Sequence, residues 1–487
     1  MAAVSWSFPE RLTGNSRVGR IAVHEIRSVA RDGTLRLASI LLLVLLLAAL
    51  LEGIRESSEL GEERAAAQEV MRHQWLEQGE KNPHSAAHLG IYAFRPASTL
   101  TFADPGLNPH VGEAIWLEAH YQNQPVYRPT RGREPLGRFG DLTFSRILQH
   151  FLPLLIILLA FQVFARERET GILAQLLATG TSRRELVIGK LSGVLGALTL
   201  LLLPVVGLAT VLLLSRGAEM EEMVRLGLLG LAYAAYLAVW VLISTVLSVR
   251  ASSGRMALVA LLSLWIVQGF ILPPAAAEVS RALHPLPSAQ AFDAQVTRDV
   301  AEGVDGHNPL AERTLQLRDS ILSEYGVDQV EDLPLNFEGV ALQAGEDFSN
   351  QVFDLRFSEL WGRIEAQNRV QLRAASLSPY LAVRSLSMAL SGTDWFHVRD
   401  FQVSAEEYRR SLVETMNLAL IHEFESQSYG DNLHGRETWE RVPEFEYTSP
   451  TLAAVLRSQG EAAAWLAAWL LFGLLLSLGV SLRSSDS

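Results

Sequence analysis

Six apolar stretches dominate the pattern of hydrophobic and polar positions along the 487-residue chain. Each has close to the number of apolar residues, about 20, that an α-helix needs to cross a bilayer. The fifth is short and ends at Pro273 and Pro274, which we expect to stop it. The six predicted spans are Leu35–Ile54, Ile147–Ala165, Leu191–Leu214, Leu226–Val249, Met256–Leu272 and Ala462–Leu482. The pattern predicts an α-helical integral membrane protein with six transmembrane helices.

Basic residues are concentrated in some of the short segments that flank these spans. Six arginines lead into the first span, five basic residues lie between the second and third, and two lie between the fourth and fifth. Cytoplasmic loops carry such an excess, so we expect both termini to be cytoplasmic and two large insertions to be extracytoplasmic. The predicted organisation is a cytoplasmic N-terminus (1–34), first span (35–54), first insertion (55–146), four spans (147–272) with a cytoplasmic loop (166–190), second insertion (273–460), and last span with tail (461–487).

The two insertions differ in composition. The first begins with a helical pattern and then becomes rich in proline and glycine, which favours short strands or irregular structure. The second is predicted to be mainly helical, with helices over Arg313–Tyr325, Asp347–Ser376 and Ser404–Glu425. Ser404 and Glu407 have the spacing of a capping box and are expected to start the last of these.

Charge and composition exclude several classes of function. From Glu278 to Arg457 there are 29 acidic and only 15 basic residues, a balance that disfavours nucleic acid because phosphate contacts need Lys and Arg. The chain has no cysteine, so disulfides and thiolate metal sites are excluded. Gly189 and Lys190 lack the upstream glycine of a phosphate-binding loop, and no hydrolase or zinc-protease motif occurs. We therefore predict no catalytic residues and no cofactor bound by this chain.

The segment from Arg17 to Gly33 has the pattern of an amphipathic helix. At 100° per residue, four arginines gather on one side and apolar residues on the other. Such a helix suits the cytoplasmic membrane interface; the alternative is a helix docked on its own protein. The basic residues of this predicted helix are Arg17, Arg20, Arg27 and Arg31.

The loop between the second and third spans is the most informative short stretch. Its leucines fall at helical spacing, Gly180 is expected to end a helix over Glu169–Ala178, and Ser182 with Glu185 forms a capping box that opens the next one. A surface helix held between two spans could transmit force from a docked protein, or the loop could merely join the spans. From Gly189 onward, small residues recur at intervals of four. This spacing favours close packing between helices over the lining of a transport pathway.

This loop resembles the coupling-helix region of ABC-2 type permeases, in which it docks into a cleft of the ATPase. The resemblance implies that the contacts to an ABC ATPase fall on this loop, with Glu167 and Glu169 at a surface that meets basic groups of that partner. The residues so implied are Glu167, Arg168, Glu169, Gly171, Leu173, Leu176, Leu177, Arg183, Arg184 and Glu185.

Segments of the insertions resemble the subgroup that carries the domain of unknown function 3526. These segments are Asn82–His88, Tyr92–Pro96, Asp104–Gly106, Trp116–His120, His284–Pro287, Leu333–Gly339 and Leu386–Asp394. The resemblance implies a permease of the inner membrane that pairs with a second permease subunit. ATP and Mg²⁺ would be bound by the partner ATPase, and the chain would serve export or work on an extracytoplasmic partner. A membrane-anchored sensor or scaffold without transport is the alternative, ahead of a membrane enzyme.

Ten of the twelve histidines lie in the two insertions. His84 and His88 are four residues apart, a spacing at which two imidazoles on a helix can share a metal, and His120 lies downstream. The sequence fixes no third ligand, so hydrogen bonding within a folded domain is the preferred interpretation of these three residues.

Overall fold

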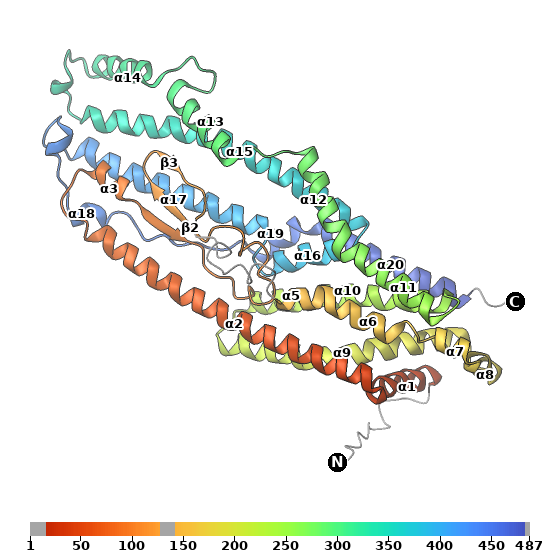
Figure 1. The fold of residues 1–487 in the computed structure, drawn as a ribbon. Coiled ribbons are helices and arrows are strands. Elements are labelled where there is room, and N and C mark those ends of the chain that lie inside the picture. Colours follow the sequence, from red (N-terminus) through yellow and green to blue (C-terminus); the bar gives the residue numbers. More distant parts are fainter. Residues whose placement is uncertain (1–15, 127–141, 483–487) are drawn as a thin grey trace.

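The computed structural model describes residues 16–126 and 142–482. Six helices long and apolar enough to cross a membrane form a bundle (Figure 1). We call its two ends the α8 end, which carries α1 (Arg17–Arg31) and α8 (Ile172–Ala178), and the insertion end, which carries both insertions. The spans are α2 (Gly33–Leu76), Phe144–Glu169, α9 (Arg183–Ser215), α10 (Met220–Arg250), Gly254–Leu283 and α20 (Gly460–Leu482).

The first span continues without a break into the first insertion. Asp32 caps α2 by accepting the backbone N–H groups of Thr34 and Leu35. The helix then runs for 44 residues because its polar second half contains no proline. Leu42, Leu46 and Leu50 recur every four residues and are buried against the bundle.

The expectation that Pro273 and Pro274 end the fifth span is wrong. The helix runs through them, as α11 (Gly254–Ile266), the π-turn η4 (Val267–Ile271) and α12 (Leu272–Leu283). The wider π-turn changes the hydrogen-bond register, and the prolines fall in the first turn of α12, where a missing N–H is tolerated. The second span also has a π-turn shortly before a proline, Pro153. Its segments are α5 (Phe144–Arg146), the π-turn η3 (Ile147–Phe151), α6 (Leu152–Ala160) and α7 (Ala165–Glu169).

The first insertion contains the short strands that its composition indicates. After α3 (Pro83–Leu89), three antiparallel strands form a sheet in the order β1 (Ile91–Phe94), β2 (Ala114–Glu118) and β3 (Tyr121–Gln122). Gly90 joins α3 to β1 with a φ of +65°, and a Cβ there would lie 2.6 Å from the Leu117 carbonyl oxygen. Glycine is therefore needed to hold α3 close to β2.

The second insertion is helical, as predicted, but two helix starts were wrong. The helix expected from Asp347 begins at Phe337 after the cap Asn336, and the helix expected from Ser404 begins at Trp395. Asp394, not Ser404, caps α17, because its carboxylate accepts the N–H of His397 while Ser404 lies inside the helix. The capping-box spacing at Ser404 does not mark a helix start, because the helix and its apolar pattern begin about ten residues earlier, after Asp394. The helices are α13 (Ala289–Glu302), α14 (Leu310–Tyr325), α15 (Phe337–Arg373), α16 (Pro379–Leu390), α17 (Trp395–His422), α18 (Arg436–Trp439) and α19 (Leu452–Ser458).

Two hydrophobic cores organise the molecule. The larger one joins the spans to α16, whose Leu381 and Leu386 are buried with residues of α10 and α20. The second one joins the insertions: Trp75 of α2 packs edge-on against Trp439 and donates its indole N–H to the Trp439 carbonyl at 2.9 Å. The two insertions are consequently one packed unit and not two independent loops.

Candidate functional site

The loop at the α8 end holds two short helices, not the single helix expected over Glu169–Ala178. Gly171 has a φ of 77° and separates α7 from α8. Leu173, Leu176 and Leu177 are half-buried and pack against the start of α9, so the protein itself covers the apolar stripe. This contact holds α8 in place, since so short a helix is unstable alone.

Lys190 is a buried cation that joins three segments of the α8 end. Its ammonium donates to Glu25 of α1 at 2.9 Å, to Glu167 of α7 at 2.8 Å and to the Val163 carbonyl at 2.9 Å. The side chain is only 3% exposed. Three donors and three acceptors leave the ammonium fully satisfied. The sequence indicated only a loop charge and an incomplete phosphate-binding pattern at Lys190, so this role was not predicted. One oxygen of Glu167 is bonded to Lys190, and contact of Glu167 with an ATPase stays a prediction.

Arg168 and Glu169 connect the same loop to the junction between α10 and α11. The Arg168 guanidinium donates to the carbonyls of Val249 and Ala251. Glu169 accepts the N–H of Gly254 at 2.8 Å, which satisfies one more N–H of the α11 first turn beside the Ser253 cap. Glu169 is exposed, but the fold also uses its carboxylate, and contact of Glu169 with basic groups of an ATPase stays a prediction.

The remaining predicted residues divide into a structural and an exposed group. Glu185 forms the predicted capping box with Ser182 and starts α9. Arg183 and Arg184 are exposed, and their side chains have no hydrogen bond or ion pair within the part of the chain that the structure describes. Ile172, 44% exposed, also faces outward. These three residues form what we call the α8 face.

Helix α1 packs on α9 through glycines. A Cβ at Gly193 would lie 2.5 Å from the Cβ of Glu25, and one at Gly189 would lie 2.7 Å from Ile21. The small residues from Gly189 onward therefore serve close packing, as predicted. The apolar side of α1 thus docks on its own protein, while Arg17, Arg20, Arg27 and Arg31 are exposed on the other side. Contact of this basic side with lipid headgroups stays a prediction.

Comparison with known families agrees with this architecture. The model of the ABC-2 family transporter proteins matches residues 20–330, which is more than half of the chain. The chain belongs to the ABC-2 transporter family. The domain of unknown function DUF3526 matches residues 289–448, the main part of the second insertion. A comparison with curated proteins finds no match. As an ABC-2 permease, the protein is the multi-pass membrane subunit of a transporter that works with an ABC ATPase.

The ABC-2 permease has a cavity of about 790 Å³ where the insertions meet the bundle. Its walls come from α2, the start of the second span, the loop before β2, and α16. His150 lies here in the π-turn η3, with its ring centroid 5.1 Å from that of Phe270 in the π-turn η4. Such turns are frequent at functional sites. The charged residues that line the cavity are Glu52, Glu56, Arg64, Asp104, Glu113, Arg146 and Arg384.

Asp104 is the most deeply buried acidic group at this cavity. Its carboxylate accepts the hydroxyl of Ser387 at 2.6 Å and the N–H of Gly106 at 3.0 Å. Burial raises the pKa of Asp104, and these hydrogen bonds only partly oppose that shift. Ser387 also contacts the hydroxyl of Tyr233 on α10 at 2.8 Å, which links the first insertion to a central span.

The three candidate histidines of the first insertion lie close together where this insertion packs against the second insertion. His84 and His88 lie on α3, and His120 lies in the two-residue turn between β2 and β3. The ring centroids are 4.9 Å apart in each of the three pairs. His120 has a φ of 71°, the left-handed region that favours glycine, and among the described residues no other non-glycine residue has a positive φ. His120 was a candidate from the sequence, but no local spacing could show that it meets His84 and His88, because a β-turn far along the chain positions it.

The protonation states of His84, in the cluster, and of Glu346, beside it, set the charge of this region. Burial lowers the pKa of His84 to about 4, so the ring is neutral at pH 7. Burial opposes the charge of Glu346 on α15, but the hydrogen bond with His120 and the nearby charge of Arg409 outweigh it and hold the pKa of Glu346 at about 2. Glu346 is thus an ionised carboxylate at neutral pH.

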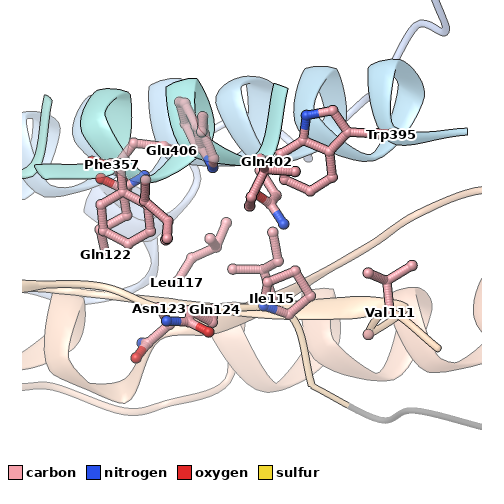
Figure 2. Close-up of a pocket in the computed structure, with 15 residues that line it drawn as sticks. Val111, Ile115, Leu117, Gln122, Asn123, Gln124, Phe357, Trp395, Gln402 and Glu406 are labelled. Atoms are coloured by element: carbon pink, nitrogen blue, oxygen red, sulfur yellow. The ribbon is translucent and has the colours of Figure 1, made fainter. Parts of the chain in front are cut away.

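A smaller cavity, of about 160 Å³, lies on another part of the interface between the insertions (Figure 2). Ile115 and Leu117 of β2 face Phe357 of α15 and Trp395 of α17 across it. Its one carboxylate, Glu406, is paired with Arg409 at 2.8 Å. Because the charge of Glu406 is neutralised and the walls are mainly apolar, we interpret this cavity as a packing gap between the insertions and not as a ligand site.

Proposed function

We propose that this permease couples ATP hydrolysis in a separate ABC ATPase to movement of its spans, and that the ATPase docks on the α8 face. One observation carries the proposal: the loop is tied internally through its buried residues, while Ile172, Arg183 and Arg184 point outward without partners in the described chain. A segment that is anchored on one side and exposed on the other is suited to receive a partner. ATP and Mg²⁺ would be held by the ATPase.

The internal contacts define how motion would pass from the α8 face to the bundle. Lys190 ties α7 to α1 and α9, and Arg168 with Glu169 ties α7 to the α10–α11 junction. A displacement of α8 would therefore move four spans together. Leucines of α8 packed against the start of α9 add a direct contact to this route.

For sidedness, we propose that the α8 end is cytoplasmic and both insertions are extracytoplasmic, in an inner membrane. The excess of arginine in the short segments at the α8 end supports this. Both insertions lie together at the opposite end (Figure 1). The cavity around His150 would then open outside, where the insertions guide cargo outward or act on an extracytoplasmic partner. A second permease subunit would complete the transporter.

The sidedness is tested with single cysteines, since the chain has none of its own. Ser323 on α14 and Ser182 at the start of α9 are both exposed. In cells with a permeabilised outer membrane, an impermeant thiol reagent should label Ser323→Cys and spare Ser182→Cys until the inner membrane is opened. Labelling in the reverse order would refute the proposed orientation.

Docking is tested by introducing a charge on the α8 face. Ile172→Asp should abolish co-purification of the co-expressed ATPase, because a carboxylate replaces an exposed apolar contact, while expression and thermal stability stay unchanged. Leu315→Asp is the matched control: Leu315 is 52% exposed on α14 at the other end, and its substitution should leave the ATPase bound. Arg184→Glu, with Arg363→Glu as control, repeats the test with charge reversal. Full ATPase binding by both α8-face variants would disprove docking at this surface.

A further inference from the structure

We propose that His84, His88 and His120 form a binding site for a divalent transition metal of the Zn²⁺ class. The nitrogen atoms that these side chains can offer lie within 4.8 Å of one another. Imidazole nitrogen is a ligand that suits Zn²⁺ and its first-row neighbours. Proximity alone does not make a site, so the orientation of each ring decides the matter.

The orientation of His120 is set by a carboxylate. Its Nδ1 lies 2.7 Å from Oε1 of Glu346, which is 2% exposed and also pairs with Arg409. An ionised carboxylate only accepts hydrogen bonds. Nδ1 of His120 must therefore carry the proton and donate it, and in the neutral ring this leaves a lone pair on Nε2.

The orientation of His84 is set by a chain of amides that also ends at a carboxylate. Asp347 accepts from the side-chain nitrogen of Gln343 at 2.8 Å. The Gln343 oxygen then accepts from Asn417 at 3.0 Å, so the Asn417 oxygen faces Nδ1 of His84 at 2.8 Å. Because each amide is fixed by the acceptor before it, Nδ1 of His84 must donate. Its Nε2 is left with a lone pair, as in His120.

The two lone pairs point toward the same place. Nε2 of His84 and Nε2 of His120 are 3.1 Å apart. Two neutral acceptors at this distance repel, whereas a cation bound by both converts the contact into an attraction. Four ligands at 2.0–2.1 Å around a tetrahedral Zn²⁺ lie about 3.3 Å from each other. The observed separation is close to that value.

His88 supplies the third ligand and an access route. It lies one helical turn after His84 on α3, and its ring is equally distant from the other two rings. His88 is exposed and the His120 side chain is 38% exposed, so an ion can enter from solvent. Three histidines with a solvent-facing fourth position form an open zinc-type site, not a closed structural one.

The second insertion holds the ligands in place from behind. Glu346 lies on α15 and Asn417 on α17, whereas all three ligands belong to the first insertion. Partners that accept the N–H of the far nitrogen of a metal-bound histidine commonly set its orientation and basicity. Metal binding would therefore fasten α3 and the β2–β3 turn to α15 and α17, and so join the two insertions.

Zn²⁺ binding to the full chain, purified in detergent and stripped with a chelator, tests the site by calorimetry. We expect one Zn²⁺ per chain, no binding of Mg²⁺ or Ca²⁺, and a rise in the thermal unfolding temperature. His88→Ala should weaken binding by at least about 100-fold, the upper limit for loss of an outer-shell partner. His73→Ala, an exposed histidine on α2, should bind as the parent protein does.

A second variant identifies the ligand directly. His88→Cys places the sole thiol of the chain at the site. With Co²⁺ it should produce a thiolate-to-cobalt charge-transfer band that the parent protein and His73→Cys lack. Absence of stoichiometric Zn²⁺ binding by the folded parent protein, equal affinity in His88→Ala, or no new band in His88→Cys would overturn the proposal. None of these outcomes depends on ATPase docking, which is measured separately.

Discussion

The α8 end and the insertion end both contain a buried charged residue that joins segments far apart in the sequence, but they differ in what remains unsatisfied. At the α8 end, Lys190 meets three acceptors, and its network is complete. At the insertion end, Arg409 and Glu346 are equally well paired. In front of them, however, Nε2 of His84 and Nε2 of His120 lie 3.1 Å apart, and the tautomers inferred above put a lone pair on each.

The comparison shows how structural and ligand-binding polar groups can be told apart. A complete buried network fixes one arrangement and needs nothing further. A set of acceptors that converge on one point, each held there by a second residue, is suited to a cation. We propose accordingly that the exposed residues of the α8 end meet a protein partner and that the histidines of the insertion end bind a metal.

Removal of the Lys190 charge should have the largest effect on the α8 end. Lys190→Met leaves Glu25 and Glu167 without their buried partner, and breaking such a pair costs about 3–5 kcal/mol. We expect α1 to detach and a protease to cut at its arginines in detergent-solubilised protein. Lys81→Met, the same change at the only other lysine, should do neither. Equal protease resistance of both variants would show that Lys190 does not hold this end together.

A steric change should separate α1 from the bundle with an intermediate effect. Gly193→Ala places a methyl group where Glu25 Cβ would be 2.5 Å away, and overpacking of this kind costs about 1–3 kcal/mol. Gly207→Ala lies on the same helix with no atom within 4 Å, and should stabilise by about 0.5–1 kcal/mol. Thermal unfolding of the pair measures the difference. A similar shift in both variants would argue against tight α1–α9 packing.

The smallest effect is expected at Glu169. Glu169→Ala removes the hydrogen bond to the Gly254 N–H while Ser253 still caps α11, and should cost about 0.5–1.5 kcal/mol. Glu169→Gln keeps an oxygen that can accept the Gly254 N–H and should be close to the parent protein in thermal stability. ATPase co-purification should fall less in either variant than in Ile172→Asp. A complete loss of ATPase binding in Glu169→Gln would instead identify this carboxylate as a direct contact.

Much of the fold was predictable because a membrane-spanning helix is recognised from a long apolar run in the local sequence. All six spans were found, as were the capping box at Ser182 and the close packing at Gly189. The end of the fifth span was not, since the π-turn η4 lets the helix continue through Pro273 and Pro274, and a π-turn has no local sequence signature. The start of α17 was misplaced because a capping-box spacing also occurs by chance inside a helix.

The features of the candidate sites also divide into those that depend on neighbouring residues in the chain and those that depend on distant ones. The sequence by itself determined the membrane class, the α8 loop and its likeness to a coupling region, because these depend on residues close together in the chain. Only the tertiary structure decided that Glu167 and Glu169 are used by the fold and that His120 meets His84 and His88. Those contacts join positions 23 to 85 residues apart, and the Glu346 contact that orients His120 spans 226. At such separations, packing of whole elements, and not any local pattern, sets which side chains meet.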